Sequence, residues 1–141
     1  MRELTEEDLK YLSLFERVTG IFPSDYLLIG ESLAFLVDEG ELGQAIGKNG
    51  KNVQQLKSML RKKVLVIAGN GDASEMAKKF FSNVRVLDIS YQPNAGLLIV
   101  SLDDRDRGIA IGKDGERIKI AKEIFMRKFN LQVELKTRRV L

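Results

Sequence analysis

Apolar residues recur at helical spacing near the start of each half of the chain. The first set is Leu9, Leu12, Phe15 and Val18, and the second is Ala73, Met76, Ala77, Phe80 and Phe81. Each set follows residues typical of a helix start, Thr5 with Asp8 three positions on and Asp72 with Glu75. A stripe of this kind packs well on a sheet. We therefore predict one amphipathic helix at the opening of each half.

Two apolar runs follow each predicted helix. They are residues 26–29 and 33–37 in the first half, and residues 84–91 and 97–102 in the second. Turn-forming residues separate the two runs of each pair, at residues 30–32 and 93–96. Such residues between β-favouring runs predict one hairpin in each half.

A second amphipathic helix and a last strand close each half. The inner stripes of these helices are Val53, Leu56 and Leu60, and then Ile118, Ala121 and Phe125. Basic residues are left largely outside, namely Lys51, Lys57 and Arg61, and then Arg117, Lys119 and Lys122. The closing strands are residues 64–67 and 131–135. The predicted order is helix, strand, strand, short helix, loop, helix and strand, and it occurs twice.

The segment that joins the last two helices of each half repeats almost letter for letter. Residues 45–50 read Ala-Ile-Gly-Lys-Asn-Gly and residues 110–115 read Ala-Ile-Gly-Lys-Asp-Gly, at an offset of 65 positions (112 − 47). A repeat that extends to the surrounding elements indicates two similar domains. Glycines at positions 69 and 71 break the pattern. We place the first domain at residues 1–69 and the second at residues 70–141.

The composition is that of a small folded protein. The chain has 141 residues, of which 44% are apolar and 30% are charged. It has no cysteine and no histidine, which removes disulfides, thiolate zinc sites, the commonest general base and the commonest metal ligand. No apolar run approaches the roughly 20 residues of a membrane span, and the acidic N-terminus is unlike a signal peptide. We expect a cytoplasmic monomer with no membrane partner, no metal and no cofactor.

Positive charge gathers around the two glycine loops. Residues 1–40 carry three basic and nine acidic side chains, whereas residues 41–68 carry six basic and one acidic. Residues 104–128 carry eight basic and five acidic side chains. Clustering of this kind is typical of a protein that binds a polyanion. A solvated helix face is the alternative that charge alone leaves open.

A Gly-x-x-Gly turn between two helices can hold a phosphate backbone. Glycine lets another chain approach because it has no Cβ, and the following helix offers free N–H groups and the positive end of its dipole. Lys48 and Lys113 add a mobile cation at the tips, and Ile46 and Ile111 offer an apolar floor for bases. One such loop is weak support for a site, because a plain helix-joining turn has the same sequence. Two copies in the same context favour a backbone clamp.

The motif Ile-Gly-Lys-x-Gly-x-x-[Val/Ile], at residues 46–53 and 111–118, resembles the signature of KH domains. The leading helix and trailing strand resemble the type II variant, and the tandem pair is similar to the short archaeal NusA-related proteins. The resemblance implies an α+β fold with two tandem type II KH domains, each a three-stranded mixed sheet with helices on one face. It also implies binding of single-stranded RNA, with about four nucleotides clamped by each loop.

The resemblance further implies a role in transcription elongation or termination, through the nascent transcript. Contact with RNA polymerase is left open, because bacterial NusA carries an additional polymerase-binding domain that these residues cannot supply. The expected RNA-binding residues of the first domain are Gly43, Ala45, Ile46, Gly47, Lys48, Asn49, Gly50, Lys51 and Lys57. Those of the second domain are Arg105, Arg107, Gly108, Ala110, Ile111, Gly112, Lys113, Asp114, Gly115, Arg117 and Lys119.

The two loops are not chemically equal. The first has Lys48 and a neutral Asn49 at its tip, whereas the second pairs Lys113 with Asp114 and is followed by Glu116. Carboxylates close to a phosphate weaken its binding, because like charges repel. We expect the first loop to bind the RNA backbone more tightly than the second.

Two other functional classes deserve comparison. An enzyme is disfavoured, because the loops lack the spacing and the Ser/Thr of a nucleotide-binding P-loop. The acidic run at residues 103–106 lacks the glycine of a calcium loop, so we expect its carboxylates to cap a helix and to pair with Arg105 and Arg107. A ribosome-associated or protein-binding KH adaptor is the main alternative, since the acidic residues 1–40 suit a basic partner.

The remaining candidates for nucleic-acid contact are weaker. Most phenylalanines fall on inward stripes, namely Phe15, Phe35, Phe80, Phe81, Phe125 and Phe129, which predicts core packing. Tyr91 is a candidate for exposure near a hairpin tip. The basic residues 136–139 either extend the basic track or form a solvated tail, and we favour the tail.

Overall fold

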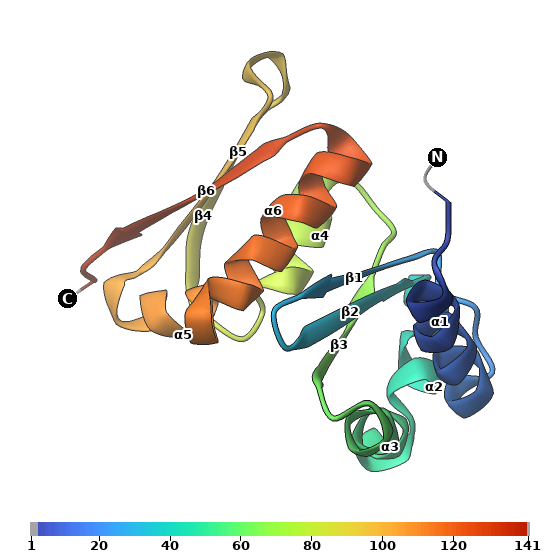
Figure 1. The fold of residues 1–141 in the computed structure, drawn as a ribbon. Coiled ribbons are helices and arrows are strands. Elements are labelled where there is room, and N and C mark those ends of the chain that lie inside the picture. Colours follow the sequence, from blue (N-terminus) through green and yellow to red (C-terminus); the bar gives the residue numbers. More distant parts are fainter. Residues whose placement is uncertain (1–2, 141) are drawn as a thin grey trace. The chain divides into compact units, whose positions relative to one another are not determined.

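The computed structural model describes residues 3–140 (Figure 1). The chain divides into two compact units, Met1–Asn70 and Gly71–Leu141. The helices and strands of the first unit are α1 (Glu6–Thr19), β1 (Asp25–Ile29), β2 (Ser32–Val37), α2 (Leu42–Ile46), α3 (Lys51–Leu60) and β3 (Lys63–Ala68). Those of the second are α4 (Ala73–Phe80), β4 (Val86–Gln92), β5 (Leu97–Asp103), α5 (Arg107–Ile111), α6 (Glu116–Phe129) and β6 (Gln132–Arg138).

Each unit contains a mixed sheet of three strands. In the first, β1 pairs antiparallel with β2, and β2 pairs parallel with β3. In the second, β4 pairs antiparallel with β5, and β5 pairs parallel with β6. A parallel pair needs a crossover, and a short helix, the glycine loop and a longer helix supply it in each unit. This is the predicted α+β fold of two tandem type II KH domains, which is confirmed.

The helices of each unit cover one face of its sheet and bury an apolar core there (Figure 1). In the first unit the rings of Phe15 on α1 and Phe35 on β2 stack with their centroids 4.3 Å apart. Leu56 of α3 belongs to the same buried cluster. In the second unit the fully buried side chains include Met76, Phe81, Leu98, Ile120 and Phe125. The predicted core positions of the phenylalanines are confirmed except at Phe129, which is half-buried.

The starts of the leading helices follow the predicted capping. Thr5 accepts a hydrogen bond from the Asp8 N–H (3.1 Å), and Asp8 accepts one from the Thr5 N–H (2.8 Å). Asp72 accepts from the Glu75 N–H at 2.8 Å. These side chains satisfy N–H groups that have no partner inside the helix.

Three local predictions were wrong. Leu9 is 50% exposed, and Tyr11 is buried on α1 instead. Strand β4 begins at Val86 and not at residue 84, because the N–H of Val84 donates to the carbonyl of Phe81 (3.2 Å) and the N–H of Arg85 donates to Asp106 (2.8 Å). Residues 136–138 are not a solvated tail, because they pair with residues 101–103 of β5 as the end of β6. Among the described residues no helix is long and apolar enough to cross a membrane.

Candidate nucleic-acid interface

The first glycine loop joins α2 to α3 by a single tight turn. Gly47 has φ 82° and ψ 165°, and the turn that follows it, Lys48–Gly50, has Asn49 at φ 56° and Gly50 at φ 73°. The Gly47 N–H donates to the carbonyl of Gly43 (2.9 Å), and the Gly50 N–H donates to the carbonyl of Gly47 (3.0 Å). The loop is therefore held by its own backbone, with the tip side chains exposed.

The second loop has the same backbone. Gly112 has φ 78° and ψ 171°, Asp114 has φ 55° and Gly115 has φ 72°. The Gly112 N–H donates to the carbonyl of Gly108 (3.0 Å), and the Gly115 N–H donates to the carbonyl of Gly112 (3.1 Å). The two loops, which differ only at Asn49 and Asp114, thus share nearly the same backbone conformation.

The two glycines of each loop are needed for different reasons. A Cβ at Gly47 would lie 2.8 Å from Cγ of Asn52, and a Cβ at Gly112 would lie 2.7 Å from Cβ of Arg117. A Cβ at Gly50 would meet nothing within 4 Å among the described residues. The first glycine of each loop is therefore required by internal packing. The second leaves an open face at Gly50, whereas a Cβ at Gly115 would lie 3.6 Å from Cε of Lys119.

The helices that follow the loops begin without a capping side chain. Gly50 is the N-cap of α3 and Gly115 is the N-cap of α6, and neither helix has a side-chain hydrogen bond at its N-cap. The leading helices α1 and α4 do have such caps. The first N–H of each helix donates to the loop instead, from Lys51 to the carbonyl of Lys48 and from Glu116 to the carbonyl of Lys113. The next N–H groups of the first turns have no capping side chain, and the helix dipole favours an anion beside them.

Most of the predicted site residues are exposed, on the loops and on the helices that flank them. They include Gly43, Lys48, Asn49, Lys51, Lys57, Arg107, Gly108, Lys113, Asp114 and Lys119. Ile46 is 36% exposed, and Ile111 is half-buried. The Lys119 ammonium donates to the carbonyl of Asp114 at 3.4 Å, which brings a cation to the second loop.

Two of the predicted contact residues do not offer any surface. Ala45 and Ala110 are fully buried, and Ala45 belongs to the core cluster of the first unit. Their small side chains let α2 and α5 pack closely on the core. Their place among the expected RNA-binding residues is therefore corrected, because these alanines pack in the core beneath the loops.

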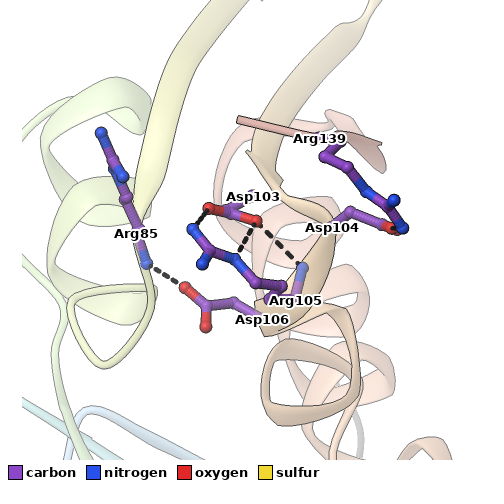
Figure 2. Close-up of polar contacts among 6 residues, drawn as sticks. All are labelled: Arg85, Asp103, Asp104, Arg105, Asp106 and Arg139. Carbon is purple, nitrogen blue, oxygen red and sulfur yellow. Dashed lines mark hydrogen bonds and ion pairs between the residues drawn. The ribbon is translucent and has the colours of Figure 1, made fainter. Parts of the chain in front are cut away.

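The acidic run after β5 fixes the turn that leads into α5 (Figure 2). Buried Asp103 accepts hydrogen bonds from the Arg105 N–H (3.0 Å), from Nε (3.2 Å) and from Nη2 (2.7 Å). The hydrogen bonds from the Arg105 side chain are the main reason why the pKa of Asp103 is lowered to about 2. The predicted capping by Asp103 and its pairing with Arg105 are confirmed. Nε and Nη2 of Arg105 are therefore engaged within the protein.

The other two carboxylates of this run also make contacts within the second unit. Asp106 accepts a hydrogen bond from the N–H of Arg85 (2.8 Å), and Asp104 lies 3.7 Å from Nη2 of Arg139 (Figure 2). These contacts connect the start of α5 to the residues that flank β4 and β6. Among the described residues no group of three or more acidic, histidine or cysteine side chains could hold a metal ion.

Arg117 lies elsewhere than the sequence predicted. Its side chain is half-buried, and its Nη2 donates to the carbonyl of Phe80 at 2.6 Å. Glu116 is also buried, at 8% exposure, in the first turn of α6. Ile109, which is not among the residues expected to bind RNA, is 54% exposed on α5 just before the loop. The 65-residue offset could have drawn attention to it, because it aligns Ile109 with the polar Gln44.

No family model matches the chain. It is 33% identical to the probable transcription termination protein NusA of Halococcus morrhuae, over 129 residues that make up 91% of this chain and 93% of that protein. It is 32% identical to the probable transcription termination protein NusA of Methanococcus vannielii, over 86% of this chain and 72% of that protein. The crystal structure of APE1850 superposes with a TM-score of 0.74 at 29% identity, covering 96% of this chain and 100% of that one.

Proposed function

Because the chain belongs to the family of archaeal NusA-like transcription termination proteins, we propose that it binds single-stranded RNA, such as a nascent transcript, and clamps the RNA backbone with its two glycine loops. The observation that carries this proposal is the uncapped start of α3 and α6, each preceded by a glycine and an exposed lysine. Backbone N–H groups, the helix dipole and a lysine then act together on one phosphate. The chain acts by binding and not by catalysis.

The first loop is the stronger clamp in this proposal. Lys48 and Lys51 flank the start of α3, and the tip residue Asn49 is neutral. In the second loop the exposed Asp114 stands at the tip, so a phosphate there meets a carboxylate. At about 6 Å in water this repulsion amounts to about 0.7 kcal/mol, which corresponds to about threefold in affinity. Lys119, which donates to the second loop, offsets part of that difference.

Charge reversal at the two loops tests the proposal. The affinity of the intact chain for a single-stranded RNA is measured by fluorescence anisotropy at low salt, for Lys48→Asp with Asn49→Asp and, separately, for Lys113→Asp. The first variant is expected to lose more affinity than the second. Lys10→Asp, an exposed charge reversal on α1, serves as the control and should change little. Equal losses in all three variants would show that overall charge, and not the loops, binds the RNA.

A protein-binding adaptor is the second candidate, and one observation favours it. Leu4 and Phe22 are 52% and 64% exposed, and both line a depression of about 280 Å³ in the acidic part of the first unit. An exposed apolar patch of this kind often marks a protein contact. The anisotropy measurement with single-stranded RNA decides between the two candidates, because an adaptor that uses this patch binds no single-stranded RNA through the loops. Contact with RNA polymerase would be a case of this second candidate function, protein binding.

A further inference from the structure

The residue two positions after the second glycine of each loop has an unusual location. This residue is Asn52 in the first unit and Arg117 in the second, and both belong to the first turn of the helix that follows the loop. Both also lie against the first glycine, since a Cβ at Gly47 or Gly112 would overlap with them. Their side chains therefore form the support beneath the loops.

Arg117 connects the second loop to the end of the leading helix. Its Nη2 donates to the carbonyl of Phe80 (2.6 Å) and to Oδ1 of Asn83 (3.3 Å). Its guanidinium also lies over the Phe80 ring, 4.7 Å from the centroid. Phe80 is the last residue of α4. A cation at this place satisfies a carbonyl that the helix leaves free and complements the negative end of the dipole.

The first unit makes the same connection with two neutral side chains. Asn52 donates from Nδ2 to the carbonyl of Gln44 (2.9 Å), and Gln44 donates from Nε2 to the carbonyl of Thr19 (3.0 Å). Thr19 is the last residue of α1, as Phe80 is of α4. The second unit has Ile109 at the position of Gln44, and an isoleucine side chain cannot donate. Arg117 alone spans the distance that Asn52 and Gln44 span together.

Placing an arginine here has a cost that the neutral pair avoids. Nε of Arg117 is buried and has no hydrogen-bond partner among the described residues. Burial lowers the pKa of Arg117, since the charged form is taken out of water. A buried donor without a partner is destabilising, so the connection to Phe80 has to outweigh it. The fold maintains a link between the loop and the leading helix in both units, by different chemistry.

We infer that Arg117 is a positioning residue that holds the second glycine loop against the end of α4, and that it is not a contact residue for RNA. The role of Arg117 in RNA binding rests on the proposed function of the loop, but its link to the end of α4 does not. Gln44 with Asn52 performs the same task for the first loop. No hydrogen bond is then needed from the side chain at position 109, so the exposed and apolar Ile109 is tolerated there.

Amide hydrogen exchange in the intact protein tests the link without RNA. The reporters are the N–H groups of Gly112 and Gly115, which are hydrogen-bonded within the loop. Arg117→Met should raise their exchange rates on the order of tenfold, because it removes hydrogen bonds from a charged group. Arg117→Lys should give only partial protection, since an ammonium cannot reproduce the planar fork and its stacking. Lys122→Met, which removes an exposed charge from the same helix, is the control.

Transplanting the arrangement of the first unit provides a rescue experiment. Arg117→Asn alone should leave the loop unprotected, and adding Ile109→Gln should restore exchange rates toward those of the wild type. Restoration is expected because Gln44 and Asn52 already make this link in the first unit. Unchanged exchange in Arg117→Met, or no restoration in the double variant, overturns the inference.

The salt dependence of RNA binding then separates positioning from contact. It is measured with Lys48→Asp and Asn49→Asp in the background, so that binding reports on the second loop. Loss of a phosphate contact would make the slope of log affinity against log salt shallower by about 0.7. Arg117→Met is expected to weaken binding with the slope unchanged, and a shallower slope with normal loop exchange would assign Arg117 to the RNA. If the wild type binds no RNA, the proposed function fails and the exchange experiment still decides the link.

Discussion

Replacing Gly50 with alanine adds one methyl group to the face of the first loop that the protein leaves open. The new Cβ would meet nothing within 4 Å among the described residues, so the only internal cost is the left-handed backbone at φ +73°. That conformation costs an alanine about 1–2 kcal/mol, which is modest against a typical stability of about 5–15 kcal/mol. The variant is therefore expected to fold.

The effect on RNA binding should be larger than the effect on folding. If the RNA backbone approaches the loop at Gly50, the methyl group displaces a phosphate from the N–H groups at the start of α3. A hydrogen bond to a charged group contributes about 1.5–3 kcal/mol, so losing one should weaken binding about 10- to 100-fold. Affinity is measured by fluorescence anisotropy, and the free energy of unfolding by urea denaturation.

Gly96→Ala is the matched control for this variant. Gly96 has φ +63°, and its nearest neighbour for a new Cβ is the carbonyl of Asn130 at 3.8 Å, so the strain is similar. It precedes β5 in the second unit, and the loop of that unit follows the far end of the same strand, whereas Gly50 belongs to the first unit. Gly96→Ala should lose similar stability and keep its RNA affinity. Equal affinity of the two variants would refute the argument that the open face of Gly50 receives the RNA.

Three further substitutions test the structural basis of the loops. Gly47→Ala places an alanine at a positive φ and puts its Cβ 2.8 Å from Asn52, so it should lower the free energy of unfolding by about 2–4 kcal/mol in urea denaturation. A loss below about 1 kcal/mol would show that the crowding is easily relieved. Asp103→Asn should lower the free energy of unfolding above pH 4 and should leave it little changed near pH 2. The reason is that folding lowers the pKa of Asp103 from near 4 to about 2, so its contribution to stability is present above pH 4 and lost toward pH 2. Profiles of unfolding free energy against pH that run parallel for the variant and the wild type would contradict this. Leu56→Ala, at a fully buried position of α3, should cost about 2–5 kcal/mol, with a change in denaturation midpoint as the measurement and an unchanged midpoint as the contrary result.

The order of elements could be predicted because each depends on local periodicity. Helical stripes, β-favouring runs and turn residues recur in the same sequence in both halves, and the repeat itself supports each assignment twice. Leu9 shows where a stripe misleads. With Thr5 as the N-cap, Leu4 and Leu9 occupy the two positions of a hydrophobic staple. Both are about half exposed, so Leu9 belongs to the helix start and not to the core.

Features that depend on a distant partner were the ones that sequence could not supply. The charges at residues 136–138 indicate solvent, but their strand pairing with β5 can be known only from the register. In the same way, Ala45 and Ala110 are small for packing reasons that only the folded core reveals. Arg117 has the charge expected of an RNA contact. Its hydrogen bond to the carbonyl of Phe80 becomes visible only once α4 and α6 are placed side by side. The loop glycines were predictable, because their conformational need is local.

A salt titration of the intact chain tests whether the two loops clamp single-stranded RNA. Binding is measured on one RNA strand and on the duplex of the same sequence. The strand should bind at low salt, with log affinity falling by about 0.7 per neutralised phosphate as log salt rises, and the duplex should bind more weakly. No binding of the strand at low salt, or equal binding of strand and duplex, would contradict clamping by the loops and favour a protein-binding adaptor.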